Sequence, residues 1–144
     1  MGRYVLKRHI ESSPERVFEG FTDPAIVADW MDLQIRDATG SLGSPGTRYT
    51  MAMWGPWRFR SEVVRSEPPT LYEFQGRGPA GARFHMVATL AALEGSTDLD
   101  LLTEYALPLG PGGRLLDRLF VDREPRTIAI RELDRLVELV SVRR

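Results

Sequence analysis

Apolar positions recur at steps of three and four residues over the stretch 111–140 of the chain. Arginine and acidic residues fill the positions between them, which predicts an amphipathic helix with a broad apolar stripe. The apolar positions are Leu115, Leu116, Leu119, Phe120, Ala129, Ile130, Leu133, Leu136, Val137 and Val140. A helix of about 30 residues spans roughly 45 Å, which exceeds the width of a small domain. We therefore expect a large apolar partner for this helix elsewhere in the chain.

Pro125 interrupts the helical pattern. A proline inside a helix removes one backbone donor and clashes with the carbonyl oxygen four residues earlier, here that of Val121. We therefore expect a kink at Pro125, or two helical segments. A kinked packing helix is the simpler interpretation, and a segment before Pro125 that moves as a lid is the alternative.

The N-terminal part of the chain predicts one strand followed by two short helices. Residues 3–10 are rich in Val, Leu, Ile and Tyr, as strands are. Ser13-Pro14 and Asp23-Pro24 each place a capping residue before a proline, which is typical of the first turn of a helix. Their apolar sides are Val17, Phe18 and Phe21 in the first helix, and Ile26, Val27, Trp30 and Met31 in the second.

From residue 33 onward the apolar period changes to two, which indicates strands. The expected strands are 33–36, the segments around Tyr49 to Met53, Trp57 to Val64 and Tyr72 to Gln75, and the long pair 84–93 and 97–107. Loops are expected at 37–46 and 76–81, which are rich in glycine or proline. Short connections make this sheet antiparallel. One apolar face then needs a cover, which the terminal helix can supply.

Composition narrows the function classes. The chain has 144 residues, 42% of them hydrophobic and 27% charged, which suits a single globular domain over 1–144. A net charge of −1 argues against nucleic-acid binding, and the lack of cysteine excludes disulfides and thiolate chemistry. We find no apolar run of signal-peptide or membrane-span length, so we expect a cytoplasmic protein without membrane insertion.

The order of these motifs resembles that of the START-like, or helix-grip, superfamily and its polyketide cyclase/dehydrase branch (SRPBCC proteins). The matching motifs are Ile10-x-x-Ser13-Pro14-x-x-Val17-Phe18, Asp23-Pro24 before Trp30, Gly46-Thr47-Arg48-Tyr49, Glu67-Pro68-Pro69 and Gly95-Ser96-Thr97-Asp98-Leu99. The resemblance covers nearly the whole chain. It implies an α+β helix-grip fold, in which a seven-stranded antiparallel sheet wraps around the long C-terminal helix and two short helices follow the first strand. It also implies a hydrophobic pocket between sheet and helix.

The alternation predicts which residues would line that pocket. Aromatic and methionine side chains with a few hydroxyls suit a flat, mostly apolar ligand held by one or two hydrogen bonds. The candidate ligand-binding residues are Trp30, Tyr49, Met51, Met53, Trp57, Phe59, Ser61, Tyr72, Phe74, Phe84, Met86, Thr103 and Tyr105, closed by Leu116 and Phe120 from the helix. Plain core packing is the alternative for each of these residues taken singly.

Conventional catalytic groups are scarce. His9 and His85 lie on different expected strands, so we expect no metal site, and no sequence feature calls for a cofactor. Asp100 and Glu104 are expected on a solvated face of their strand, as are Arg58 and Arg60. Ser61, Tyr72 and Tyr105 are the weak catalytic candidates.

Three functions remain open from the sequence. The first is a binding module for a small hydrophobic molecule, either aromatic or polyketide-like. The second is a polyketide aromatase/cyclase or dehydratase that uses tyrosine and serine groups. The family's cyclases also use an arginine in the pocket, whereas this sequence has Val63 where that residue would be wanted. The third is a protein-interaction domain of the co-chaperone type. Both a monomer and a homodimer are compatible with the sequence.

Overall fold

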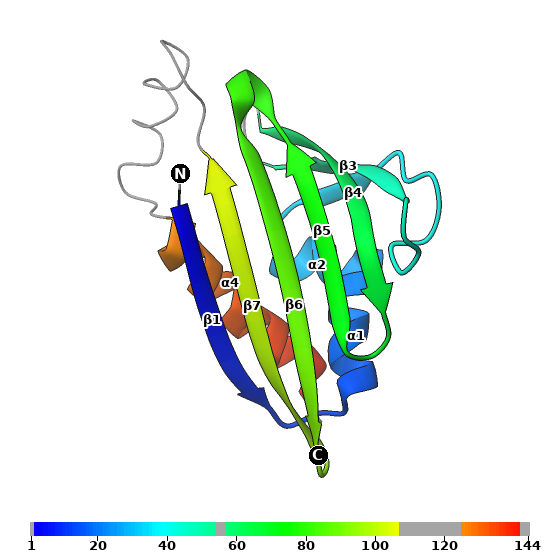
Figure 1. Cartoon of the computed structure of the whole chain (residues 1–144), viewed down its shortest axis with the longest axis vertical. Coiled ribbons are helices and arrows are strands. Elements are labelled where there is room, and N and C mark those ends of the chain that lie inside the picture. Colours follow the sequence, from blue (N-terminus) through cyan, green and yellow to red (C-terminus); the bar gives the residue numbers. More distant parts are fainter. Residues whose placement is uncertain (1, 54–56, 107–124, 142–144) are drawn as a thin grey trace.

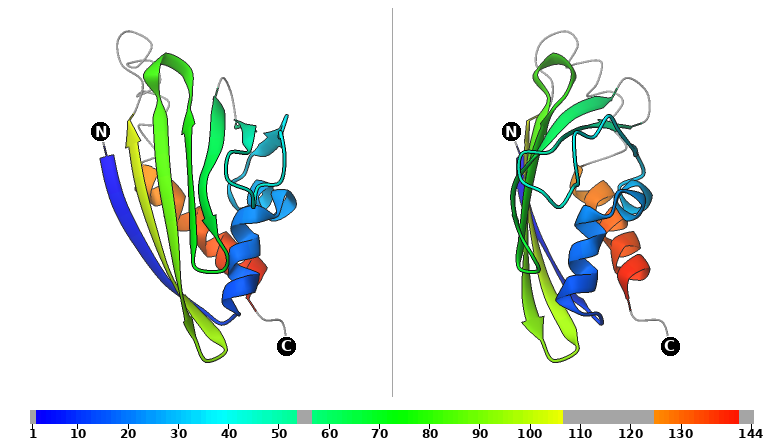
Figure 2. Two further views of the ribbon diagram at one scale, coloured as in Figure 1. Left: turned by 45° about the vertical axis from the view of Figure 1, so that its right-hand side comes forward. Right: turned by 90° about the vertical axis from the view of Figure 1, so that its right-hand side faces the viewer.

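One antiparallel sheet carries helices on one of its faces (Figures 1 and 2). The structure is a computed structural model that describes residues 2–53, 57–106 and 125–141. Its seven strands lie in the order β1-β7-β6-β5-β4-β3-β2. The strands are β1 (Gly2–Ile10), β2 (Gln34–Arg36), β3 (Arg48–Ala52), β4 (Arg58–Glu67), β5 (Leu71–Arg77), β6 (Arg83–Leu93) and β7 (Ser96–Ala106). The described helices are α1 (Pro14–Thr22), α2 (Pro24–Trp30), α4 (Pro125–Val140) and the 3₁₀ turn η1 (Pro79–Gly81). The predicted α+β helix-grip architecture is confirmed.

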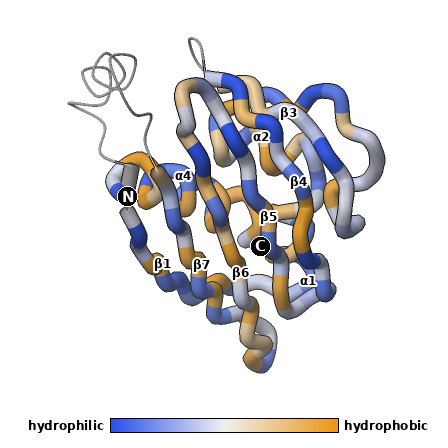
Figure 3. The backbone as a smooth tube through the Cα atoms, turned by 45° about the horizontal axis from the view of Figure 1, so that its top comes forward, coloured by the Kyte–Doolittle hydropathy of each residue, from blue (hydrophilic) through white to orange (hydrophobic). Residues whose placement is uncertain are grey.

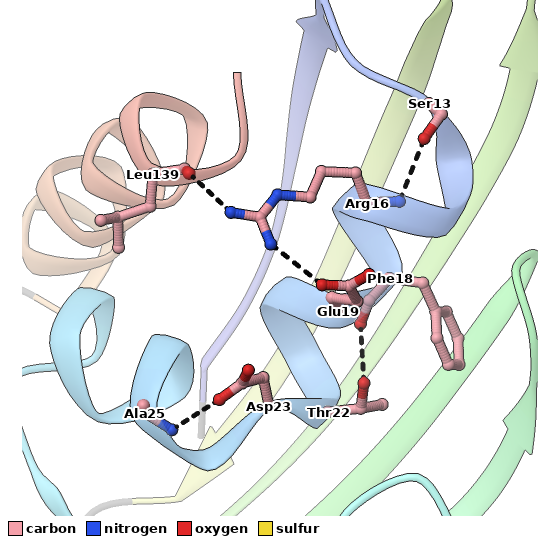
Figure 4. A network of polar contacts seen from close by, with 8 residues as sticks. All are labelled: Ser13, Arg16, Phe18, Glu19, Thr22, Asp23, Ala25 and Leu139. Atoms are coloured by element: carbon pink, nitrogen blue, oxygen red, sulfur yellow. Dashed lines mark hydrogen bonds and ion pairs between the residues drawn. The ribbon is translucent and has the colours of Figure 1, made fainter. Parts of the chain in front are cut away.

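The two short helices begin at the predicted capping residues. The Ser13 hydroxyl accepts a hydrogen bond from the backbone N–H of Arg16 at 3.2 Å, and the Asp23 carboxylate accepts one from Ala25 at 2.9 Å (Figure 4). Each side chain satisfies a backbone donor that has no partner within its helix. Pro14 and Pro24 take the first helical positions, where a missing N–H costs nothing. The predicted starts of both short helices are therefore confirmed.

Helix α1 also packs closely against α4. The Arg16 guanidinium donates to the carbonyl oxygen of Leu139 at 3.4 Å and pairs with Glu19 at 2.9 Å (Figure 4). Gly20 lies against Leu136, and a Cβ at this glycine would come within 2.5 Å of that side chain. The absence of a side chain at Gly20 thus allows the two helices to approach.

Hydrophobic and hydrophilic positions alternate along the strands (Figure 3). Val63, Phe74, Leu99 and Leu101 are 0–2% exposed on the helix-covered face. The longest strands, β6 and β7, are joined by a two-residue turn, since Leu93 pairs with Ser96. Gly95 in this turn has a φ of 71°, which a residue with a side chain rarely adopts.

Helix α4 crosses the inner face of the sheet as a second layer together with α1 and α2 (Figure 2). Ala129, Leu133, Leu136 and Val140 are the buried positions of α4, and they follow the predicted spacing. The predicted helical segment before Pro125 lies outside the described residues, as do Leu116, Phe120 and the lid alternative. No described helix has the length and apolar character needed to cross a membrane.

Candidate functional site

A cleft of about 590 Å³ lies between α4 and one end of the sheet. Its sheet residues come from the first half of β1, the chain after β3, the start of β4, the start of β6 and the end of β7. These segments meet at one end of the sheet because neighbouring strands run antiparallel. The lining residues are Tyr4, Asp29, Trp30, Met31, Asp32, Met53, Trp57, Phe59, Ala82, Arg83, Phe84, Tyr105, Ala106, Thr127, Ile128, Ala129, Arg131, Glu132 and Arg135. The volume falls in the range of small-molecule sites.

Aromatic rings in mutual contact form the sheet side of the cleft. Trp57 and Phe59 stack with an interplanar angle of 3° and a centroid distance of 5.8 Å. Phe59 meets Phe84 edge to face at 5.4 Å, and Phe84 meets the core residue Phe74 in the same way at 5.7 Å. The wall is thereby continuous with the packed core, which holds the rings in one orientation.

Two glycines leave the space that the Phe84 and Phe59 rings occupy. A Cβ at Gly76 would lie 2.5 Å from the Phe84 ring, and one at Gly78 would lie 2.8 Å from the Phe59 ring. Real Cβ atoms do not approach ring carbons so closely, so any larger residue at either position would displace a ring of the wall. The positions of the Phe59 and Phe84 rings in the cleft wall therefore depend on glycine near the end of β5 and just after it.

The helix side of the cleft is more polar. Arg135 on α4 donates two hydrogen bonds to Asp29 on α2, at 2.8 and 3.1 Å. These bonds hold the pKa of Asp29 below its usual value. Arg135 also pairs with Glu138 at 3.1 Å, so its charge is shared between two carboxylates. The Asp29–Arg135 pair ties α2 to α4 at the margin of the cleft.

Glu132 is the unusual carboxyl of the cleft. It is partly buried, and within the described part of the chain its carboxyl makes no hydrogen bond or ion pair. Burial, and to a smaller degree the negative charge of Asp32, raises the pKa of Glu132 to about 8. At neutral pH the carboxyl is therefore mostly protonated, and it can donate a hydrogen bond as well as accept one.

The structure divides the candidate residues from the sequence into two groups. Trp30, Met53, Trp57, Phe59, Phe84 and Tyr105 line the cleft together. Tyr49, Met51, Ser61, Tyr72, Phe74, Met86 and Thr103 are outside its lining, and apart from the partly buried Met86 they are buried. Their alternation placed them on the inner face of the sheet, where they belong to the packed interior; Tyr72, for example, lies against Phe18 and Phe21 of α1.

The three weak catalytic candidates differ in their surroundings. The Tyr72 hydroxyl donates to the backbone carbonyl of Leu42 at 2.6 Å, and burial raises the pKa of this phenol. The Ser61 hydroxyl is buried without a hydrogen-bond partner among the described residues, close to the Phe84 ring over Gly76. Tyr105 lines the cleft and lies beside Tyr4, with their ring centroids 6.0 Å apart. Only Tyr105 of the three is therefore placed to touch a molecule in the cleft.

The outer face of the sheet carries the two histidines. His85 pairs with Glu73 at 2.6 Å and with Glu104 at 3.4 Å, and His9 pairs with Asp98 at 2.8 Å. Within the described ranges, no group of three or more metal-ligating side chains could hold a metal ion. Both histidines therefore contact carboxylates at exposed or half-exposed positions on the face of the sheet opposite the cleft.

A second hollow of similar volume lies at the other end of α4. Its lining residues are Ser12, Ser13, Arg16, Gly95, Leu139, Val140 and Ser141. This lining holds no aromatic ring, and its one charged side chain, Arg16, already bonds Glu19 and Leu139. It therefore offers a ligand fewer contacts than the aromatic cleft does.

Sequence reasoning missed the polar side of the cleft, namely Glu132 and its neighbours Asp29, Asp32 and Arg135. A signal for Glu132 was present, because it stands three residues after Ala129 and four before Leu136 on the margin of the apolar stripe. A glutamate at the margin of an apolar stripe would face the apolar surface of the sheet, unless the sheet leaves a space beside the helix at that point.

The chain matches a known protein family over almost its whole length. Residues 1–140 match the family described as polyketide cyclase / dehydrase and lipid transport. The chain belongs to this family. The START-like resemblance inferred from the motifs is thereby confirmed. No curated protein matches the chain significantly.

Solved structures share the fold at low sequence identity. Protein MLL2253 from Mesorhizobium loti is 19% identical, with 96% of each chain covered and a TM-score of 0.71. Protein CV1439 from Chromobacterium violaceum is 18% identical, with 99% of this chain and 100% of that chain covered and a TM-score of 0.71. Truncated norcoclaurine synthase from Thalictrum flavum is 13% identical, with 99% and 95% covered and a TM-score of 0.66. At these identities the likeness concerns the fold alone.

Proposed function

We propose that this protein binds a small hydrophobic molecule, aromatic or polyketide-like, in the cleft between the sheet and α4. The observation that carries this proposal is the wall of contacting aromatic rings, Trp57, Phe59 and Phe84, that lines a cleft of about 590 Å³. Such a wall gives a planar ligand a large apolar contact area. Membership of a polyketide cyclase/dehydrase and lipid transport family supports a general role in binding hydrophobic ligands.

Binding can be tested by filling the cleft. We would screen neutral naphthalene and flavonoid compounds by native mass spectrometry and by quenching of tryptophan fluorescence, since Trp30 and Trp57 line the cleft. Ile128 lines the cleft from the same face of α4 as Glu132, so Ile128→Trp puts a larger side chain at the cleft, whereas Ala91→Trp adds a tryptophan at an exposed position of β6. We expect Ile128→Trp to weaken binding at least tenfold and Ala91→Trp to leave it unchanged. Binding that survives Ile128→Trp would place the ligand elsewhere, and the absence of any bound compound would refute the proposal.

Catalysis on such a ligand is the second candidate, favoured by the presence of Tyr105 and Glu132 in one cleft. A phenol and a protonated carboxyl can both transfer protons to an oxygen-bearing substrate. Turnover of an aromatic polyketide or lactone substrate that is lost in Tyr105→Phe, with binding retained, would place catalysis above simple binding. If the wild-type protein shows no turnover, ligand binding remains the proposed function and catalysis is rejected.

A protein-interaction role has less support. Among the described residues, Val5 and Leu93 are the exposed large hydrophobic side chains, and they lie on β1 and at the end of β6. Two separate residues do not form the contiguous apolar patch that a protein partner needs. The cytoplasmic location and the choice between monomer and homodimer stay predictions from the sequence.

A further inference from the structure

Glu132 lines the cleft from the helix, opposite a wall that is almost entirely apolar. It lies four residues after Ile128 and three before Arg135, so the three side chains share one face of α4. All three line the cleft. A ligand that lies against Phe59 and Phe84 therefore has Glu132 among the groups it meets on its other side.

The surrounding charges do not neutralise this carboxyl. On its own helix, Arg135 is engaged with Asp29 and Glu138, and Arg131 is exposed. Just after α2, Asp32 adds negative charge, whereas the charge of Asp29 on α2 is balanced by Arg135. The remaining titratable lining groups are Tyr4 of β1, Tyr105 of β7 and the exposed Arg83 of β6.

These surroundings favour the neutral carboxyl, because a carboxylate there loses hydration and lies near Asp32. A neutral carboxyl presents one O–H donor to the cleft. Within the described residues no protein group accepts that hydrogen bond, and the carboxyl oxygens of Glu132 keep contact with solvent. When a ligand fills the cleft, a carbonyl oxygen on it can take the place of water as the acceptor.

We propose that Glu132 determines which ligands the cleft accepts, by donating a hydrogen bond from its neutral carboxyl to a carbonyl oxygen of an uncharged aromatic ligand. This inference rests on the proposed function and adds the polar half of the ligand to it. The cleft then selects aromatic ketones, quinones or lactones over hydrocarbons of the same shape. It does so below the pH at which Glu132 ionises.

Two probes of nearly equal shape can test this selection. 2-Acetylnaphthalene carries a carbonyl, whereas 2-ethylnaphthalene does not, and calorimetry or tryptophan quenching measures both dissociation constants at pH 6.5 and 9.0. For the wild-type protein we expect a ketone preference on the order of tenfold at pH 6.5, as one hydrogen bond supplies. We expect that preference to fall severalfold at pH 9.0, where most of Glu132 is ionised. Tyr4 stays protonated over this range, because burial raises the pKa of its phenol.

Variants of Glu132 distinguish the effect of its hydrogen-bond donor from the effect of its charge. Glu132→Gln keeps an N–H donor without a titrating group, so its ketone preference should persist at both pH values. Glu132→Leu should lose the preference and still bind 2-ethylnaphthalene. Asp134→Asn changes an exposed carboxylate of the same helix and should behave as the wild-type protein does. Circular dichroism checks the folding of each variant, and the wild-type pH comparison needs no variant at all.

Each failure has a distinct meaning. Equal binding of the two probes by the wild-type protein overturns the inference and leaves the proposed function intact. A ketone preference that does not change between pH 6.5 and 9.0, or that survives Glu132→Leu, also overturns it. Failure of the wild-type protein to bind either probe counts against the proposed function itself, and the inference falls with it.

Discussion

Replacing Glu132 with glutamine should remove a pH dependence of stability that arises in the cleft. The pKa of this carboxyl is about 8 in the folded protein against 4.5 for the exposed group. The folded state therefore holds the proton more tightly than the unfolded state does. The corresponding stability is fully present below pH 4.5 and is lost progressively as the pH rises toward 8.

The magnitude follows from the size of the pKa shift. Each unit corresponds to about 1.4 kcal/mol, so a shift from 4.5 to about 8 sets an upper limit of roughly 5 kcal/mol on the loss above pH 8. Because Glu132 is only partly buried, solvent screens part of this effect. We expect the wild-type protein to lose about 3 kcal/mol relative to Glu132→Gln between pH 5 and pH 9.

Urea unfolding at pH 5, 7 and 9 measures this difference. Subtracting the unfolding free energy of the variant from that of the wild type cancels the contributions of other titrating groups. One of these is His9, whose pKa is raised by hydrogen bonds to Asp98 and Glu11. With a urea slope of about 1–3 kcal/mol per molar for a small domain, the relative midpoint should move by at least about 1 M. Asp134→Asn serves as the control on the same helix and should track the wild type. A wild-type minus Glu132→Gln difference that stays constant within about 0.5 kcal/mol over this range would refute the reasoning.

Three further predictions concern packing, each measured by urea unfolding. Leu133 of α4 is 0% exposed, so Leu133→Ala should cost about 2–5 kcal/mol through the cavity it leaves. Gly78→Ala should cost about 1–3 kcal/mol, because its new methyl group lies 2.8 Å from the Phe59 ring. The matched change Gly43→Ala meets its nearest atom at 3.6 Å and should cost less than about 1 kcal/mol. Ser61→Ala should change stability by less than about 1 kcal/mol, since the buried hydroxyl has no partner among the described residues.

The outcomes that would contradict these packing predictions are specific. A cost below about 1 kcal/mol for Leu133→Ala would mean that α4 is not seated on the sheet as described. Equal costs for Gly78→Ala and Gly43→Ala would mean that the Phe59 ring has room to move. A loss above about 2 kcal/mol in Ser61→Ala would reveal a hydrogen bond from this hydroxyl in solution.

The helices and strands could be predicted from the sequence because their signals are local. Ser13 and Asp23 cap helices through backbone groups two or three residues away. Alternation along β4 and β5 assigned Val63 and Phe74 to the covered face, since successive side chains of a strand point to opposite faces. The motifs also sufficed to indicate the family and its helix-grip fold.

The cleft itself is a property of the tertiary structure. Tyr72 and Phe84 share the inner face of the sheet, yet Tyr72 is buried under the helices and Phe84 lines the cleft. Alternation reports the face of a strand but not how far along it the helices extend. Among the described residues, the helices cover the middle of the sheet and a cleft remains at one end, so position along the strand separates wall residues from core residues.

The chemistry of Glu132 was likewise decided by tertiary contacts. The spacing of residues along the chain is enough to place a glutamate at the margin of the apolar stripe of α4. Whether that carboxyl is hydrated and charged or partly buried and neutral depends on what the end of the sheet and Asp32 place around it. Hydration and charge proximity are set by groups distant in the chain, and only the folded protein brings those groups together.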